Sequence, residues 1–171
     1  MNRTKWFDKK FKFELSHEQF EFVLKKLKQK PDEIEKLVSP LSQEFLNKRI
    51  DSKWSIKENI GHLIDLEELH DARIDDFIDG KEMLRPADLQ NRKTEEASHN
   101  SKDIFELTNR LKSVREKFIS RIREMDESAR NHVSIHPRLN QPMRPIDMAQ
   151  FVLEHDEHHI NTINELISKL Q

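Results

Sequence analysis

The chain has no cysteine and only two glycines among its 171 residues. Without cysteine it has no disulfide bond, no cysteine-ligated zinc or iron–sulfur site and no thiolate nucleophile of its own. The two glycines, Gly61 and Gly80, cannot form the G-x-G-x-x-G turn or the P-loop that cradle phosphate groups. The composition therefore argues against the common glycine-rich nucleotide-binding folds.

Long apolar runs are absent as well. No stretch approaches the roughly 20 apolar residues that a membrane-spanning helix needs, and the opening MNRTKWFDKKFKFELS lacks the apolar segment of a signal peptide. We therefore expect a cytoplasmic protein with no membrane partner. The 30 basic and 32 acidic residues nearly balance. They form no basic block of the kind that nucleic-acid binding usually requires, so we expect no nucleic-acid partner.

The residues that are present favour a folded, helix-rich chain. Charged residues make up 36% of the sequence and hydrophobic residues 35%, with ten phenylalanines to build a core. A chain of this length fits one domain, so residues 1–171 are predicted to form a single domain.

Apolar residues recur at helical spacing in four long segments, which we expect at about 16–40, 55–80, 101–125 and 146–170. The second is opened by an S-x-x-E capping box, Ser55 with Glu58. Pro31 is expected to bend or restart the first, and a short helical turn is expected at 42–47. Because no strand pattern of useful length interrupts these segments, the sequence predicts an all-α protein, an antiparallel four-helix bundle.

Three irregular segments complete this picture. Residues 1–15 alternate aromatic and charged side chains and are expected to form an extended arm lying on the bundle. Residues 81–100 and 131–144 are two long polar loops without helical periodicity. Loops of this length in a compact domain are commonly functional.

The histidines of the last predicted helix suggest metal binding. His155 and His159 are four residues apart, so they lie one turn apart on one face, beside the apolar positions Val152 and Ile163. His62 similarly borders the apolar stripe of the second helix. Three imidazoles with a coordination position left open are typical of catalytic divalent metal sites.

The same pattern leaves plainer interpretations open. A histidine beside an apolar stripe is also compatible with a hydrogen-bonded core or surface residue. His158 lies on a different face from the pair and is expected to be a supporting or surface residue, and no site role is assigned to His17, His70, His99 or His132. An H-E-x-x-H motif is absent from the last helix, which disfavours a metalloprotease.

The chain resembles the DinB-like superfamily of metal-binding four-helix bundles, which includes bacterial thiol-dependent S-transferases. The resemblance covers nearly the whole chain and is carried by WSIKENIGHL at 54–63 and by H-x-x-H-H-I at 155–160. The His136-Pro137-Arg138 element looks like one in the bacillithiol-transferase branch, whereas the loop 85–94 is similar to an uncharacterised branch.

This resemblance implies that His62, His155 and His159 bind a divalent ion, with nickel or zinc as the expected metal. It also implies that His136 and Arg138 border the substrate pocket, and we extend this expectation to Asn91 and Arg92. An up-and-down bundle places the two long loops at opposite ends unless one folds back, which argues against both reaching one pocket. We nevertheless expect both at its rim.

The first functional hypothesis is a metal-dependent thiol S-transferase acting on a small-molecule substrate. The metal would lower the pKa of a low-molecular-weight thiol cosubstrate, while Arg92, Lys93, Arg138 or Arg144 would hold an anionic thiol carrier. A metal-dependent hydrolase uses the same site with water. A non-catalytic metal- or ligand-binding stress protein is the third alternative, and a homodimer also stays open.

Overall fold

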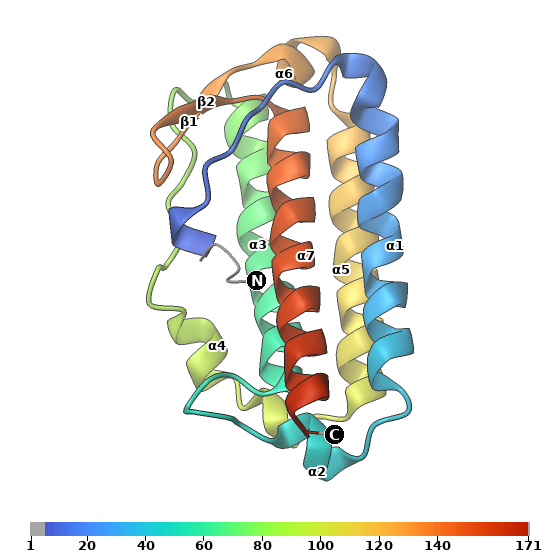
Figure 1. The fold of residues 1–171 in the computed structure, drawn as a ribbon. Helices are drawn as coiled ribbons and strands as arrows, with labels where there is room; N and C mark the ends of the chain where they lie inside the picture. The colour runs from blue at the N-terminus through green and yellow to red at the C-terminus, as the bar shows by residue number, and fades with distance from the viewer. Residues whose placement is uncertain (1–5, 171) are drawn as a thin grey trace.

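The computed structural model describes residues 6–170, so positions 1–5 of the predicted arm and Gln171 lie outside the described residues. Figure 1 shows a bundle of four long helices: α1 (Phe20–Val38), α3 (Ile56–Ile78), α5 (Ile104–Glu124) and α7 (Pro145–Leu170). The predicted all-α four-helix bundle is confirmed. The shorter helices are η1 (Trp6–Asp8), η2 (His17–Gln19), α2 (Gln43–Asn47), α4 (Arg92–Glu96), η3 (His99–Ser101) and α6 (Glu127–Asn131).

Local hydrogen bonds explain where the helices begin. The backbone N–H of Ser55 donates to Glu58 Oε2 (2.8 Å) and the N–H of Glu58 donates to Ser55 Oγ (3.2 Å), which is the capping box that the sequence predicts. The third long helix starts after Asp103, not at Ser101 as expected, because the Asp103 carboxylate accepts the N–H of Phe105 (2.8 Å).

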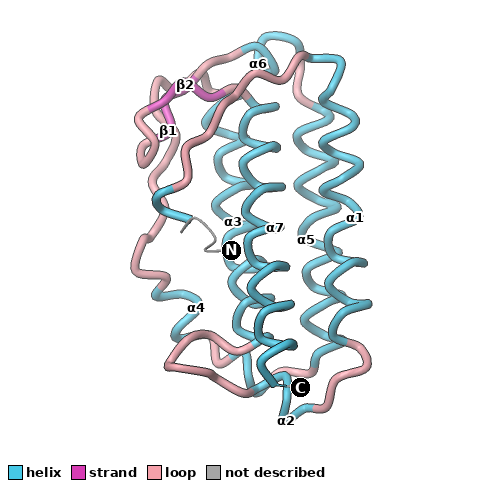
Figure 2. The backbone as a smooth tube through the Cα atoms, viewed as in Figure 1, coloured by secondary structure: helices cyan, strands magenta, loops and turns pink. Residues whose placement is uncertain are grey.

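Pro31 neither ends nor restarts α1, which continues as one helix to Val38 (Figure 2).

The direction of the helices is more complex than an alternating up-and-down bundle. In Figure 1, α3 and α5 run in one direction while α1 and α7 run in the other. Along the ion pairs between α3 and α5, the residue numbers rise in the same order on both helices: Glu67 with Arg115, Asp71 with Lys117 and Asp75 with Arg121. The neighbours α3 and α5 are therefore parallel, whereas α3 and α7 are antiparallel, because the connection 79–103 returns along the length of the bundle before α5 begins.

This returning connection is attached to a β-hairpin that the sequence does not predict. Strands β1 (Ser134–His136) and β2 (Gln141–Met143) pair antiparallel, and each has three residues, too few for an alternating pattern to be visible. The N–H of Leu84 donates to Ile135 O (3.0 Å), and the N–H of Ile135 donates to Glu82 O (2.7 Å). Both predicted long loops therefore lie against each other.

The buried side chains form two apolar clusters separated by a polar layer. One cluster surrounds Phe77, Phe118 and Phe151, near the hairpin, and includes Phe11 of the arm. The arm therefore packs on the bundle, as predicted, over the residues that the structure describes. The other cluster contains Ile60 and surrounds the opposite ends of the helices. The buried polar residues of this layer on α3, α5 and α7 include His62, Glu67, His70, Arg73, Arg115, His155, Asp156 and His159.

Among the described residues, no helix is long and apolar enough to cross a membrane.

Candidate metal centre

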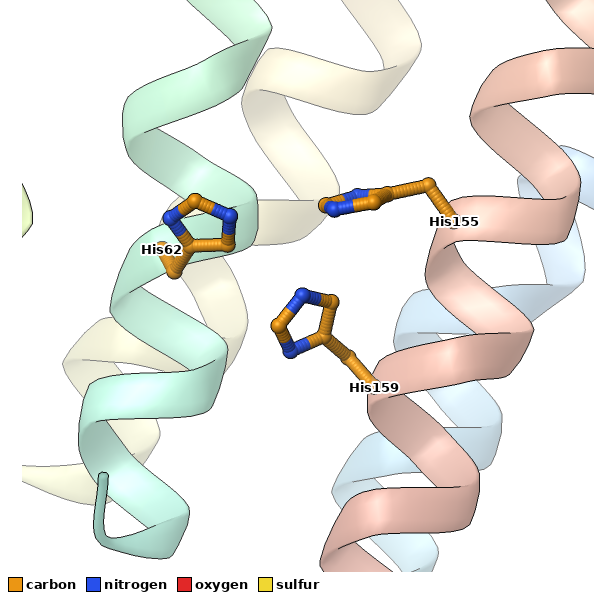
Figure 3. A group of neighbouring side chains, drawn as sticks. All are labelled: His62, His155 and His159. Atoms are coloured by element: carbon orange, nitrogen blue, oxygen red, sulfur yellow. The ribbon is translucent and has the colours of Figure 1, made fainter. Parts of the chain in front are cut away.

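Three histidines of the polar layer converge on one point. His62 projects from α3, and His155 and His159 project from α7, toward one another (Figure 3). One ring nitrogen of each lies within 4.8 Å of those of the other two, and the side chains are buried, with 5%, 6% and 6% of their surface exposed. The predicted convergence is confirmed. That these residues bind a metal stays a prediction.

Helix geometry brings the rings together. His155 and His159 are one turn apart on α7, and their ring centroids are 4.6 Å apart. The His62 ring lies across the interface, 5.4 Å from the His155 ring and 4.9 Å from the His159 ring. The antiparallel contact between α3 and α7 thus joins residues that are distant in the sequence.

The orientation of the His159 ring is set by Asn59. The Asn59 side-chain amide donates to Ser55 O (2.8 Å) and Trp54 O (3.2 Å), so its Oδ1 is turned toward His159 Nδ1 at 2.8 Å. Because this oxygen can only accept, the proton of a neutral His159 ring lies on Nδ1 and the lone pair on Nε2. Hydrogen bonds of this kind commonly orient metal-binding imidazoles.

His62 is supported by a longer chain of hydrogen bonds. Its Nδ1 lies 3.2 Å from Thr94 Oγ1, and the Thr94 hydroxyl donates to Asp65 Oδ2 (2.9 Å). The same carboxylate oxygen contacts His99 Nε2 at 2.8 Å. Since the Thr94 proton is given to Asp65, Thr94 accepts from His62 Nδ1, which again places the lone pair on Nε2.

Burial favours the neutral form of two of the candidate ligands, His62 and His155. Burial lowers the pKa of His62 to about 4. Burial, followed by the neighbouring His159 and His62, lowers the pKa of His155 well below its ordinary value. Metal binding requires unprotonated imidazole. The donor set, its burial and its oriented rings therefore fit a divalent ion such as zinc or nickel.

The three histidines form part of the wall of a cavity of about 660 Å³. Both long loops contribute to this wall, as predicted, because 81–100 folds back beside the hairpin. The residues from these loops are Pro86, Ala87, Asp88, Leu89 and Asn91 from the first and His136, Pro137 and Arg138 from the second.

The structure separates the predicted substrate-binding residues into two groups. His136, Arg138 and Asn91 line the cavity. Arg92 is not among the lining residues: its side chain is exposed and its Nε donates to Asp88 Oδ2 (3.1 Å). The substrate-binding roles themselves stay predictions.

Two further cations that were expected to hold a thiol carrier also lie outside the cavity wall. Lys93 Nζ is 2.5 Å from Glu68 Oε2, and Arg144 Nη2 is 2.8 Å from Asp147 Oδ1. Both charges are therefore partly neutralised by a neighbouring carboxylate.

Two tryptophans beside the histidines were not predicted as site residues. Trp54 comes directly before the N-cap residue of α3, and its ring lies 4.7 Å from the His62 ring. Trp6 of the arm lies 4.9 Å from the His155 ring and 5.6 Å from the His158 ring. His158 itself is half-buried and lines the cavity outside the group of three converging nitrogens, and the supporting or surface role expected for it stays a prediction.

Arg73, Asn59 and Thr94 were also missed. Arg73 and Asn59 carry a signal in the sequence, because the spacing Asn59, His62, Leu66, Leu69, Arg73 follows one face of α3, and all five side chains line the cavity. Thr94 has no such signal, since it contacts His62 only because the loop folds back.

Comparison with known proteins identifies the family. The sequence profile of the DinB superfamily matches residues 26–163, well over half of the chain. The chain therefore belongs to the DinB superfamily.

Solved structures show the same fold. YfiT from Bacillus subtilis, described as a probable metal-dependent hydrolase with an unusual four-helix bundle topology, superposes with a TM-score of 0.80. The two are 18% identical, and the match covers 95% of this chain and 93% of that one. A mycothiol-dependent maleylpyruvate isomerase superposes with a TM-score of 0.66 at 13% identity, covering 82% of this chain and 59% of that one.

No protein with curated functional information matches this chain by sequence.

Proposed function

We propose that this protein is a metal-dependent enzyme whose ion is held by His62, His155 and His159. The observation that carries the proposal is that three buried imidazoles converge at the wall of a cavity large enough for a small-molecule substrate. Structural zinc sites usually have four protein ligands. Among the described residues, the candidate site has three side chains that could bind the ion, His62, His155 and His159, which is one fewer than a structural zinc site usually has.

Thiol S-transfer is the reaction that we propose first. A divalent ion at such a site supplies Lewis-acid activation of a thiol or a water molecule. Since the chain has no cysteine, the thiol must come from a small cosubstrate. The cavity of about 660 Å³ offers room for a cosubstrate as well as an electrophile. The fold shared with a mycothiol-dependent isomerase supports this choice.

Hydrolysis is the second candidate. It is favoured by the similarity over nearly the whole chain to YfiT, which is described as a probable metal-dependent hydrolase. The histidines and the cavity would serve it equally well, with water in place of the thiol.

In either reaction, the protein side chains would position the substrate. Asn59 and Thr94 hold His159 and His62 in place, Trp54 and Trp6 limit access of water to the rings, and His136, Arg138 and Asn91 contact the substrate. We propose a small-molecule substrate and a cytoplasmic location, with neither nucleic acid nor membrane as partner. A homodimer stays open.

The test uses protein purified without an affinity tag and loaded with the metal found by elemental analysis. Consumption of monochlorobimane, an electrophile, is measured with and without a panel of low-molecular-weight thiols, and hydrolysis of p-nitrophenyl acetate is measured in parallel. Turnover that needs a thiol supports S-transfer, whereas thiol-independent ester turnover supports the hydrolase. His159→Ala is the control for metal-independent background.

A protein that binds metal and catalyses neither reaction would contradict both enzymatic candidates and leave the non-catalytic metal-binding alternative. The substrate contacts are tested with Arg138→Ala, which should raise KM, against Arg92→Ala, which should not. Equal effects of these two substitutions would contradict the cavity as the substrate site.

A further inference from the structure

Two arginines in the cavity wall form no ion pair with a carboxylate of the described residues. Arg73 lies on α3, three turns after His62 on the same face, and only 2% of its surface is exposed. Arg138 follows the β1 strand and lines the same cavity. A buried guanidinium is costly unless it is paired and hydrogen-bonded.

The partners of Arg73 are neutral. Its Nε and Nη2 donate to Arg85 O (3.1 and 2.9 Å), and its Nη1 lies 3.2 Å from His136 Nε2. Asp76, the acidic residue that influences Arg73, is bound by Arg85 at 2.7 Å. Among the described residues, no carboxylate forms an ion pair with Arg73.

The protonation states leave the positive charge in place. Burial, followed by the charges of Arg73 and Arg138, lowers the pKa of His136 to about 3, so the imidazole is neutral. Burial lowers the pKa of Arg73 only to about 10, so its guanidinium stays charged near neutral pH.

Arg138 has a donor without a protein acceptor. Its Nη2 is buried and has no hydrogen-bond partner among the described residues. The guanidinium lies over three aromatic rings, 5.3 Å from the centroid of Phe7, 5.7 Å from that of Phe151 and 5.8 Å from that of Trp6. These rings hold the guanidinium in place, but they do not accept its in-plane hydrogen bonds. Leaving such a donor unsatisfied costs free energy that a ligand can recover.

We propose that Arg73 and Arg138 form a subsite for a carboxylate group of the ligand. This deepens the proposed function, because it assigns the substrate or cosubstrate to the carboxylic acids with an apolar body. The planar guanidinium matches a carboxylate in a bidentate arrangement. Leu69, Pro86 and Phe151 in the same wall suit an apolar body.

The position of the subsite connects it to the metal centre. Trp6 contacts both the Arg138 guanidinium and the His155 ring, and Phe151 lies one turn before His155 on α7. A carboxylate bound by the two arginines therefore directs the other end of the ligand toward the three histidines.

The test measures binding of benzoate by isothermal titration calorimetry to the full-length protein after removal of metal by a chelator. Benzamide, which is neutral and of similar shape, and phenyl phosphate are the comparison ligands. We expect benzoate to bind at least about tenfold more tightly than benzamide, as a charge-assisted hydrogen bond predicts.

The variants isolate the arginines. Arg138→Gln should weaken benzoate binding about tenfold or more and leave benzamide binding unchanged, whereas the exposed, cavity-remote control Arg92→Gln should change neither. Arg73→Gln should act like Arg138→Gln. If loss of the Arg73 contacts unfolds that variant, the benzoate affinity of Arg138→Gln alone tests the subsite.

Equal binding of benzoate and benzamide, or equal effects of the Arg138 and Arg92 substitutions, would overturn the subsite. Binding of phenyl phosphate without binding of benzoate would overturn its assignment to carboxylates. Because benzoate binding is measured on metal-free protein, its outcome does not depend on the proposed metal-dependent reaction. If the protein bound benzoate but never bound metal, the proposed enzymatic function would be refuted and the carboxylate subsite would still be supported.

Discussion

At the scale of single residues, the site depends on which nitrogen of each ring carries the proton. Asn59 orients the His159 ring and Thr94 orients the His62 ring, in each case through a hydrogen bond to the histidine Nδ1. The Nε2 atom of each ring therefore carries the lone pair that could bind an ion. Removing such oriented hydrogen bonds commonly lowers metal affinity about 10- to 100-fold. If the three histidines bind an ion as proposed, Asn59 and Thr94 would contribute to its affinity without touching it.

His159→Ala should lower zinc affinity by about 100-fold or more, a larger loss than substitution of a supporting residue causes. His158→Ala is the matched control, because His158 is the next residue but stands outside the three converging nitrogens, and it should change affinity much less. Competition titration against a chromophoric chelator measures both. Equal losses would mean that the wrong face of α7 has been assigned.

Gly61→Ala should destabilise the protein by about 1–3 kcal/mol through overpacking. A Cβ at this position would lie 2.2 Å from the His99 ring, which is held by Asp65 at 2.8 Å. Urea unfolding measures the change in free energy. In a His99→Ala background the clash is gone, so most of the cost should disappear; an unchanged cost there would refute this explanation.

At the scale of elements, a buried ion network joins three helices in the polar layer. Arg115 of α5 donates to Glu67 Oε1 of α3 (2.8 Å) and also binds Asp156 of α7. Burial raises the pKa of the Asp156 carboxyl despite Arg115, and the charge of Arg115 helps to lower that of Glu67 against the opposing effect of burial. The network therefore links the helices that carry the candidate ligands.

Connection 79–103, the fold-back segment, is anchored by one apolar side chain as well as by its hydrogen bonds to the hairpin. Leu84 is 1% exposed, so Leu84→Ala should cost about 3 kcal/mol in free energy of unfolding. Leu89 is in the same segment but 57% exposed, and Leu89→Ala should stay within about 0.5 kcal/mol. Urea denaturation of both variants checks this contrast; equal costs would show that Leu84 does not anchor the segment.

At the scale of the whole molecule, the cavity is made by parts that are distant in the chain. Its wall combines Trp6 of the arm, His62 of α3, Pro86 of the fold-back segment, Arg138 of the hairpin loop and His155 of α7. A ligand or metal that binds the folded cavity and not the unfolded chain should stabilise the native state.

Chelation of the metal should therefore lower the melting temperature. Metal at about 100 times its dissociation constant stabilises the native state by about 2.7 kcal/mol, which corresponds to roughly 5–10 °C for a chain of this size. Differential scanning calorimetry with and without chelator measures the shift. His159→Ala should show little shift on chelation, and an unshifted wild-type protein would argue against a resident metal.

Much of the architecture was predictable because it is encoded locally. The capping box at Ser55, the four apolar periodicities and the one-turn spacing of His155 and His159 each depend on residues a few positions apart. The hairpin and the start of the third helix were not predicted, since three-residue strands show no period and Asp103 competes with Ser101 as a cap.

The sequence by itself determined the helices, the absence of cysteine chemistry and the histidines that could share an ion. Only the tertiary structure decided that connection 79–103 folds back, making α3 and α5 parallel. This topology brings Thr94 to His62, and the hairpin places Arg138 in the same cavity wall as Arg73. The physical reason is that helical periodicity specifies which face is buried, whereas the partners of polar loop residues depend on contacts between segments far apart in the chain.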